Sequence, residues 1–198
     1  MTRRALVVCT ANVCRSPVVE QMLTRRLDGL VDLDGQPWVV TSAGIAGGLD
    51  PVDPDTTKVA AEYELDLDAH RSRRLDESIV REDGADLVIT MSRDHLRAVA
   101  GISPAAWPRT FTLKEIVRRS LAVSAPAGDV AGWLDSVTAG RRAADLLRPD
   151  PADDVQDPYH RGERAMRAMF QEVDRLVGDL VHLGPWRLSD PGSDAVEV

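Results

Sequence analysis

The chain has 198 residues, of which 43% are hydrophobic, and a formal net charge of −8 at neutral pH. This length favours one domain with one sizeable core, and the acidic balance argues against nonspecific binding to nucleic acid. The N-terminal apolar run is too short for a secretion signal, and no run approaches the ~20 apolar residues of a membrane-spanning helix. We therefore expect a cytoplasmic protein whose two cysteines take part in chemistry rather than in a disulfide framework.

Strands and helices are predicted to alternate along the chain. Continuous apolar runs with β-branched residues indicate buried strands, and apolar residues at helical spacing indicate amphipathic helices. In chain order we expect a strand at residues 4–9, a helix from residue 17, a strand at 38–41, a helix at 55–64, a strand at 86–91, a short helix at 94–100, a strand at 109–113 and helices at 114–121 and 161–183.

This order predicts an α/β fold, a flavodoxin-like four-stranded parallel sheet with helices on both faces. Residues 1–184 are expected to form the single domain, with an insertion at about residues 122–155 that contains a helix within 129–147. Residues 185–198 show no periodicity and end in acidic residues, so we expect a mobile C-terminal tail. Ligands bind at the carboxyl ends of the strands in such sheets.

The segment VCTANVCRSP, residues 8–17, follows the first strand and opens the first helix. Ser16 suits the N-cap and Pro17 the first helical position. A loop before a helix N-terminus directs backbone N–H groups at an anion, and Arg15 adds a planar fork for two phosphate oxygens. The phosphate-binding residues are predicted to be Thr10, Ala11, Asn12, Val13, Cys14 and Arg15.

The same donors favour the thiolate form of Cys9, which would then lie under a bound phosphoryl group as an in-line nucleophile. The spacing Cys9-x5-Arg15-Ser16 therefore predicts attack on phosphorus, with the Ser16 hydroxyl available to the departing sulfur. A buried cysteine beside an exposed arginine is the structural alternative. Two cysteines this close do not specify a zinc site, so no metal is expected.

VCTANVCRSP resembles the phosphate-binding loop of the low-molecular-weight protein tyrosine phosphatases, and Asp157-Pro158-Tyr159 resembles the general-acid loop of that family. The resemblance spans roughly residues 5–180, with residues 122–155 outside the usual pattern. It implies hydrolysis of phosphotyrosine in proteins without a cofactor. Asp157 would protonate the leaving oxygen and then act as base for water, a contribution of roughly 10²–10⁴-fold.

The resemblance also implies supporting residues. Asn12 tolerates left-handed backbone, and its side chain is expected to be held by Ser16, Ser42 and His70. Ala11 replaces the usual glycine, at a cost of ~1–2 kcal/mol if its φ is positive. The substrate walls are expected to be Val13, Ile45, Leu49 and Tyr159, with Tyr159 as the only ring, which resembles the bacterial branch of the family.

Three alternatives stay open at this point. An arsenate reductase that uses a small-thiol cofactor would share the fold and the loop, as would a phosphoarginine phosphatase, although the apolar Val13 suits a phenyl ring better than a guanidinium. A noncatalytic phosphate-binding module would not need Cys9, Arg15 and Asp157 together. Cys14 is either an apolar filler or the partner of Cys9 in a protective disulfide. The expected macromolecular partner is a phosphorylated protein, for which a tyrosine kinase is one candidate.

Overall fold

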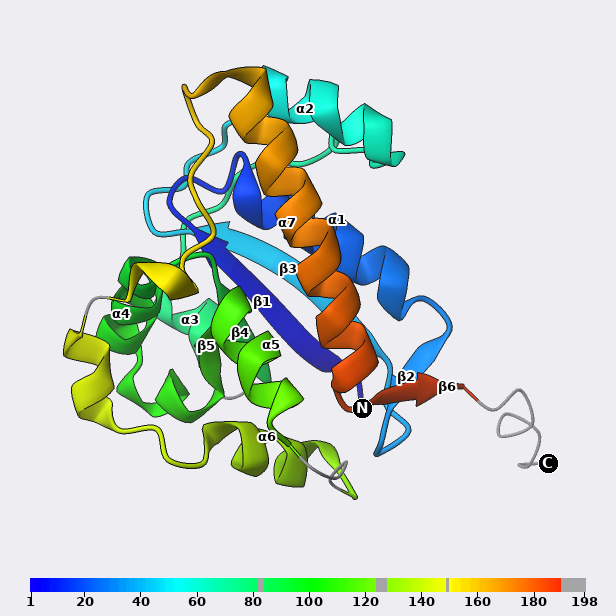
Figure 1. The fold of residues 1–198 in the computed structure, drawn as a ribbon, viewed down its shortest axis with the longest axis vertical. Coiled ribbons are helices and arrows are strands. Elements are labelled where there is room, and N and C mark those ends of the chain that lie inside the picture. The colour runs from blue at the N-terminus through cyan, green and yellow to red at the C-terminus, as the bar shows by residue number, and fades with distance from the viewer. Residues whose placement is uncertain (82–83, 124–127, 149, 190–198) are drawn as a thin grey trace.

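The computed structural model describes residues 1–81, 84–123, 128–148 and 150–189 (Figure 1). The strands are β1 (Arg3–Cys9), β2 (Leu30–Asp32), β3 (Trp38–Gly44), β4 (Leu87–Thr90), β5 (Thr110–Thr112) and β6 (Trp186–Leu188). The α-helices are α1 (Arg15–Leu27), α2 (Pro54–Ala60), α3 (Glu77–Val80), α4 (Arg93–Ile102), α5 (Leu113–Leu121), α6 (Val130–Thr138) and α7 (Gly162–Leu183). Short 3₁₀ helices are η1 (Ala61–Tyr63), η2 (Pro104–Arg109), η3 (Ala143–Leu147) and η4 (Pro151–Asp153).

Four strands form one parallel sheet in the order β3-β1-β4-β5, which confirms the predicted flavodoxin-like arrangement. Cys9 pairs with Gly44 of β3, and Thr90 of β4 pairs with Val8. The carboxyl ends of β1, β3 and β4 are therefore level, and residues that follow these strands meet at one edge of the sheet.

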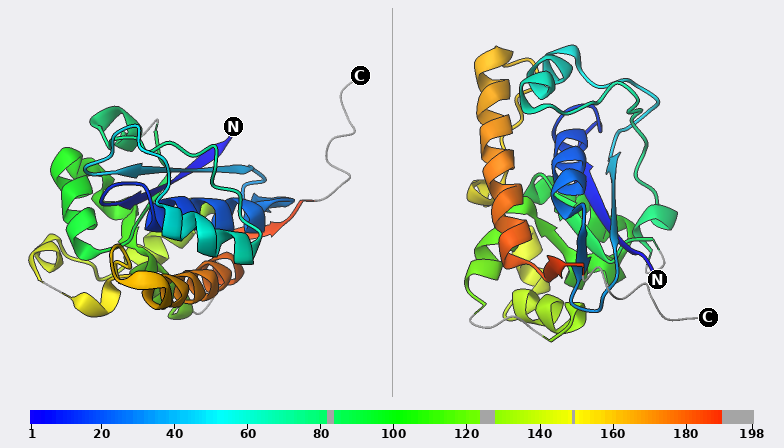
Figure 2. Two further views of the ribbon diagram at one scale, coloured as in Figure 1. Left: turned by 90° about the horizontal axis from the view of Figure 1, so that it is seen from above. Right: turned by 90° about the vertical axis from the view of Figure 1, so that its right-hand side faces the viewer.

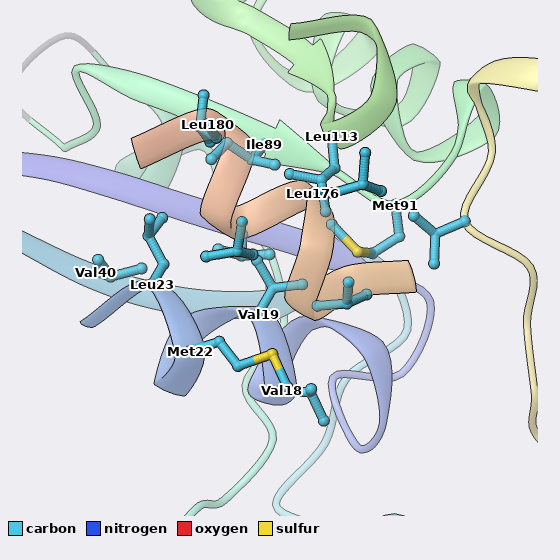
Figure 3. Close-up of a cluster of buried hydrophobic side chains, with 14 of the residues drawn as sticks. Val18, Val19, Met22, Leu23, Val40, Ile89, Met91, Leu113, Leu176 and Leu180 are labelled. Atoms are coloured by element: carbon cyan, nitrogen blue, oxygen red, sulfur yellow. The ribbon is translucent and has the colours of Figure 1, made fainter. Parts of the chain in front are cut away.

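The alternating side chains of β1 divide the core between the two faces of the sheet. Ala5 and Val7 belong to a cluster with α1, α2, α5 and α7, whereas Leu6 and Val8 pack in a second cluster with α3 and α4. Figure 2 shows α1, α2 and α7 on one side of the sheet, and Figure 3 shows part of the larger cluster between α1, α7 and the strands. Burial on both faces explains why the strands are continuous apolar runs.

The predicted helix within residues 129–147 is interrupted. The helix α6 ends at Thr138, and Gly140 adopts a positive φ of 77°, which ends the helical path before η3. Buried side chains of α6, among them Trp133 and Val137, join the larger core cluster. The insertion therefore packs against the same core as α5 and α7.

The prediction of a mobile tail from residue 185 is wrong for its first residues. Residues 186–188 form β6, which pairs antiparallel with β2, and they are not part of a mobile tail. Trp186 packs edge-on against Trp38 at the start of β3, with ring centroids 5.6 Å apart. The remainder of the predicted tail, from residue 190, lies outside the described residues. No helix in the described ranges has the length and apolar character needed to cross a membrane.

Candidate active site

The loop between β1 and α1 directs hydrogen-bonding groups at the sulfur of Cys9. Cys9 is 3% exposed, its Sγ lies 2.9 Å from Oγ of Ser16, and the backbone N–H of Asn12 donates to it at 3.3 Å. The predicted cap is wrong, because α1 begins at Arg15 and Cys14 occupies the N-cap position. Pro17 still fits the first turn, where N–H groups have no intrahelical acceptor. Ser16 therefore faces the sulfur instead of capping the helix.

Asn12 carries the strained backbone of the loop, with a φ of 58°. Asparagine tolerates this left-handed conformation better than most residues. Ala11 is outside the left-handed region, so the alanine costs no backbone strain. The expectation for Asn12 is confirmed, and the departure at position 11 is mild.

The Asn12 side chain connects the loop to its surroundings. Its Nδ2 donates to Oγ of Ser16 at 2.9 Å and to Oγ of Ser42 at 2.7 Å, and its Oδ1 accepts from the backbone N–H of Arg73 at 3.0 Å. His70 lies in the network in a different way from the prediction. Its Nε2 is 2.9 Å from the backbone carbonyl of Asn12, not from the side chain. Both polar atoms of the Asn12 side-chain amide therefore hold the loop in place.

The buried guanidinium of Arg15 joins the loop to Asp157, which is distant in sequence. Arg15 Nη2 donates to Oδ2 of Asp157 at 2.6 Å and to Oγ1 of Thr10 at 3.2 Å, and Nη1 donates to the carbonyl of Val155 at 3.3 Å. The Asp157 side chain is half-exposed, and its Oδ1 accepts from the N–H of Tyr159. The Arg15 guanidinium, the Asp157 carboxylate and the Cys9 thiol therefore lie at the same site.

A cavity of about 570 Å³ opens above this cluster. It is lined by the loop residues 9–11 and 13–15, by residues 50–54, and by Asp157 and Tyr159. Val13 and Tyr159 are therefore at the cavity, as expected for walls. Ile45 and Leu49 are not among the lining residues: Ile45 packs against the second core cluster, and Leu49 is 85% exposed. The wall expected from those two is formed by Asp50, Pro51, Val52, Asp53 and Pro54.

Comparisons with known proteins agree with this geometry. A family model described as low molecular weight phosphotyrosine protein phosphatase matches residues 4–129. The chain belongs to this family. The low molecular weight protein-tyrosine-phosphatase Etp of Escherichia coli (strain K12) is 36% identical over 171 residues, which are 86% of each chain.

Solved structures show the same fold. A low molecular weight protein tyrosine phosphatase from T. tengcongensis superposes with a TM-score of 0.65 at 26% identity and covers 91% of this chain and 99% of its own. The YwlE arginine phosphatase from Geobacillus stearothermophilus superposes with a TM-score of 0.63 at 25% identity and covers 90% of each chain. The similarity in fold therefore extends well beyond residue 129.

Residues 153–155, just before Asp157, are bound to the carboxyl end of β4 and to two helices. The backbone N–H of Val155 donates to the carbonyl of Met91, directly after β4. Asp154 accepts from the backbone N–H of Arg93, and the buried Asp153 pairs with Arg93 and with Arg118. These contacts tie residues 153–155 to α4 and α5, so Asp157 follows a fixed segment.

A buried arginine anchors the insertion itself. The Arg141 side chain is 1% exposed and lies over the rings of Trp107 and Phe111, 3.8 and 4.1 Å from their centroids. It also pairs with Glu115 at 2.9 Å. Burial lowers the pKa of Arg141 to about 10, against the opposing effect of Glu115. The guanidinium remains charged at neutral pH and ties the insertion to α5.

Cys14 is buried beside Met166, with 3.8 Å between the two sulfur atoms. Burial raises the pKa of its thiol to about 12, although a hydrogen bond with Thr56 acts in the opposite direction. Cys9 and Cys14 are both free thiols in this structure, and a disulfide between them stays a prediction. In the described ranges, no three His, Cys, Asp or Glu side chains are grouped so as to hold a metal ion.

Three further polar residues support the site and were not predicted from the sequence. Arg73 donates to Asn12, Glu20 accepts from the Ser42 hydroxyl, and His95 contacts Thr10. Burial, reinforced by the charge of Arg15, lowers the pKa of His95 to about 4. A sequence signal exists for His95, because residues just after β4 reach the same edge of the sheet as the loop after β1.

Proposed function

We propose that this chain hydrolyses phosphotyrosine in proteins through a phosphocysteine intermediate. The observation that supports the proposal best is the position of Arg15, whose guanidinium contacts both the phosphate-binding loop and Asp157 above the buried sulfur of Cys9. A phosphoryl group held by this arginine and by the loop N–H groups would place its phosphorus over the sulfur.

In the first step, the Cys9 thiolate attacks phosphorus, an S–P bond forms and the P–O bond to the tyrosine breaks. Asp157, in its acid form, gives its proton to the phenolic oxygen as it leaves. The half-exposed carboxyl at the rim of the cavity suits this role, because the leaving oxygen points away from the sulfur in an in-line displacement.

In the second step, the Asp157 carboxylate takes a proton from water, which attacks phosphorus while the S–P bond breaks. Inorganic phosphate is released and Cys9 becomes a thiolate again. Ser16 Oγ, 2.9 Å from the sulfur, can donate to the developing negative charge.

The ion pair between Arg15 and Asp157 lies where the phosphoryl group of the substrate would bind. Arg15 Nη2 donates to Oδ2 of Asp157 at 2.6 Å. A phosphate dianion held by Arg15 would replace this contact and leave the Asp157 carboxyl at the rim of the cavity, beside the leaving oxygen.

The walls of the cavity favour an aryl phosphate. Val13, Val52 and the ring of Tyr159 offer apolar surface beside the loop. We further propose that the substrate is a phosphorylated protein, with a tyrosine kinase as one candidate, and that the chain acts in the cytoplasm. A reducing compartment keeps the Cys9 thiol available for attack.

Turnover of p-nitrophenyl phosphate tests the proposal. Cys9→Ser should abolish turnover, and Arg15→Lys should nearly abolish it, because lysine lacks the fork that binds two oxygens. Arg25→Lys, on the exposed side of α1, is the matched control and should retain turnover. Asp157→Ala should lower turnover strongly while phosphocysteine remains detectable after acid quench. Unchanged turnover in Cys9→Ser would contradict the mechanism.

The alternative activities are separated by comparing substrates. The parent protein is assayed with a phosphotyrosine peptide, with phosphoarginine and with arsenate plus a small thiol. We expect the highest kcat/KM with the phosphotyrosine peptide, because its phenyl ring matches the apolar walls. Faster release of phosphate from phosphoarginine, or oxidation of the thiol that depends on arsenate, would assign the site to one of the other reactions.

A further inference from the structure

A buried histidine connects α4 with the arginine of the phosphate-binding loop. His95 lies in the first turn of α4, and its Nε2 is 2.9 Å from Oγ1 of Thr10. The same oxygen accepts a hydrogen bond from Nη2 of Arg15 at 3.2 Å. We propose that His95 is a positioning residue for Arg15 and acts through the Thr10 hydroxyl, an inference that rests on the proposed phosphatase function.

The ring of His95 is itself held on its other side. Ser92, the N-cap of α4, accepts from the backbone N–H of His95, and its Oγ lies 2.9 Å from Nδ1 of the same residue. Ser92 Oγ keeps its own hydrogen, which it can donate to Nδ1. The proposed relay uses this tautomer, in which Nε2 carries the ring proton and donates to Thr10. The relay therefore runs from Ser92 through His95 to Thr10.

The consequence for Arg15 is a guanidinium fixed at two points. Nη1 donates to the carbonyl of Val155, and Nη2 donates to Thr10. Neither contact involves Asp157, so both can remain when a phosphate takes the place of that carboxylate. Thr10 is exposed at the cavity, so without the ring of His95 its hydroxyl would be free to rotate toward solvent. His95 removes that freedom before the substrate arrives.

The charges around His95 fit a neutral ring in this role. Arg15 faces it from the loop, Asp157 from the segment after η4, and Asp94 from α4 itself. Burial and the guanidinium disfavour a positive ring, and the two carboxylates only partly oppose them. A neutral ring donates to Thr10 without repelling Arg15.

Equilibrium binding of inorganic phosphate, measured by calorimetry, tests the inference without turnover. The variants are His95→Ala, Thr10→Val and the double variant. Each single change should weaken phosphate binding about 3- to 10-fold, the effect of losing one ordinary hydrogen bond, because the change reaches the phosphate only through Arg15. The double variant should be no weaker than the singles, because both remove the same relay.

Conservative variants separate positioning from folding. In His95→Gln, the side-chain amide can donate to Thr10, so phosphate binding should recover to within about twofold of the parent. Replacement of the exposed His182 of α7 by alanine is the matched control. A purely structural role would lower the melting temperature without this rescue. If His95→Ala does not fold, two other measurements decide between a positioning role and a structural role. These are phosphate binding by Thr10→Val, a variant at an exposed position, and the ¹⁵N signals of the His95 ring in the parent protein.

In the parent protein, ¹⁵N signals of the ring should show a neutral His95 with its proton on Nε2. Additive losses in the double variant, phosphate affinity within twofold of the parent in Thr10→Val, a parent that binds no phosphate, or a proton on Nδ1 would overturn the inference. A parent that binds phosphate with this dependence on His95 but does not hydrolyse aryl phosphates would contradict the proposed function and leave the positioning role intact.

Discussion

Replacing His95 by glutamine should flatten the dependence of protein stability on pH. The pKa of His95 is about 4 in the folded protein and 6.5 for an ordinary histidine, mainly because of burial. Between these values the unfolded chain binds a proton that the folded protein does not bind. The free energy of unfolding therefore falls as the pH decreases through this interval.

The magnitude follows from the two pKa values. One proton contributes about 1.4 kcal/mol per pH unit, so the loss between pH 6.5 and 4 amounts to about 3 kcal/mol. This part of the stability is fully present above pH 6.5. It is absent from the pH dependence of His95→Gln, although other groups contribute to the slope in both proteins.

Urea unfolding at several pH values between 4.5 and 7.5 measures the difference. The parent should lose stability faster than His95→Gln below pH 6.5, and the two slopes should agree above it. Replacement of the exposed His182 by glutamine controls for the removal of any histidine. Parallel curves for the parent and His95→Gln throughout the range would refute the assignment of a neutral, buried ring.

Three further changes test the packing around the site. Arg141→Ala removes the more deeply buried of the two arginines that pair with Glu115, together with its contacts to two aromatic rings, and should reduce the free energy of unfolding by about 3 kcal/mol in urea. Gly44→Ala should lower kcat/KM by about tenfold or more, because its Cβ would lie 2.7–2.8 Å from the loop backbone at residues 10–12. In Cys9→Ser protein, iodoacetamide should modify Cys14 about a thousandfold more slowly than a free thiol, as its pKa of about 12 predicts.

Each of these changes has a matched control in the chain. Arg148→Ala removes an exposed arginine of the same insertion and should leave the stability within about 0.5 kcal/mol of the parent. Gly101→Ala adds a Cβ in open space on α4. If the control variant of either pair lost as much stability or kcat/KM as its partner, the contacts of Arg141 or the close packing at Gly44 would not explain the loss. Rapid modification of Cys14 would contradict its burial.

Local signals were sufficient for the sheet and the phosphate-binding loop. The strand before Cys9 is a continuous apolar run because helices cover both faces of the sheet, and the spacing between Cys9 and Arg15 is set within one loop. The parallel direction of the strands also follows from their alternation with helices. These features depend on residues that are close in sequence.

Features that depend on distant contacts could not be predicted in the same way. The strands β2 and β6 have three residues each and pair across more than 150 positions, so neither carries a pattern of its own. The wall expected from Ile45 and Leu49 is formed instead by residues 50–54, since the loop turns Leu49 outward. Arg141 resembles an ordinary surface arginine in sequence, and only the rings of Trp107 and Phe111 explain its burial.

The distribution of tryptophan rings has a practical consequence for spectroscopy. Trp38, Trp133 and Trp186 lie together around the start of β3, with Trp186 in ring contact with the other two, and Trp107 lies against Arg141. None of the four lines the cavity above Cys9, where Tyr159 supplies the ring. Intrinsic tryptophan fluorescence should therefore report on local unfolding around β2 and β6 and in the insertion. Detecting a ligand in the cavity would instead require a tyrosine signal or an added fluorophore.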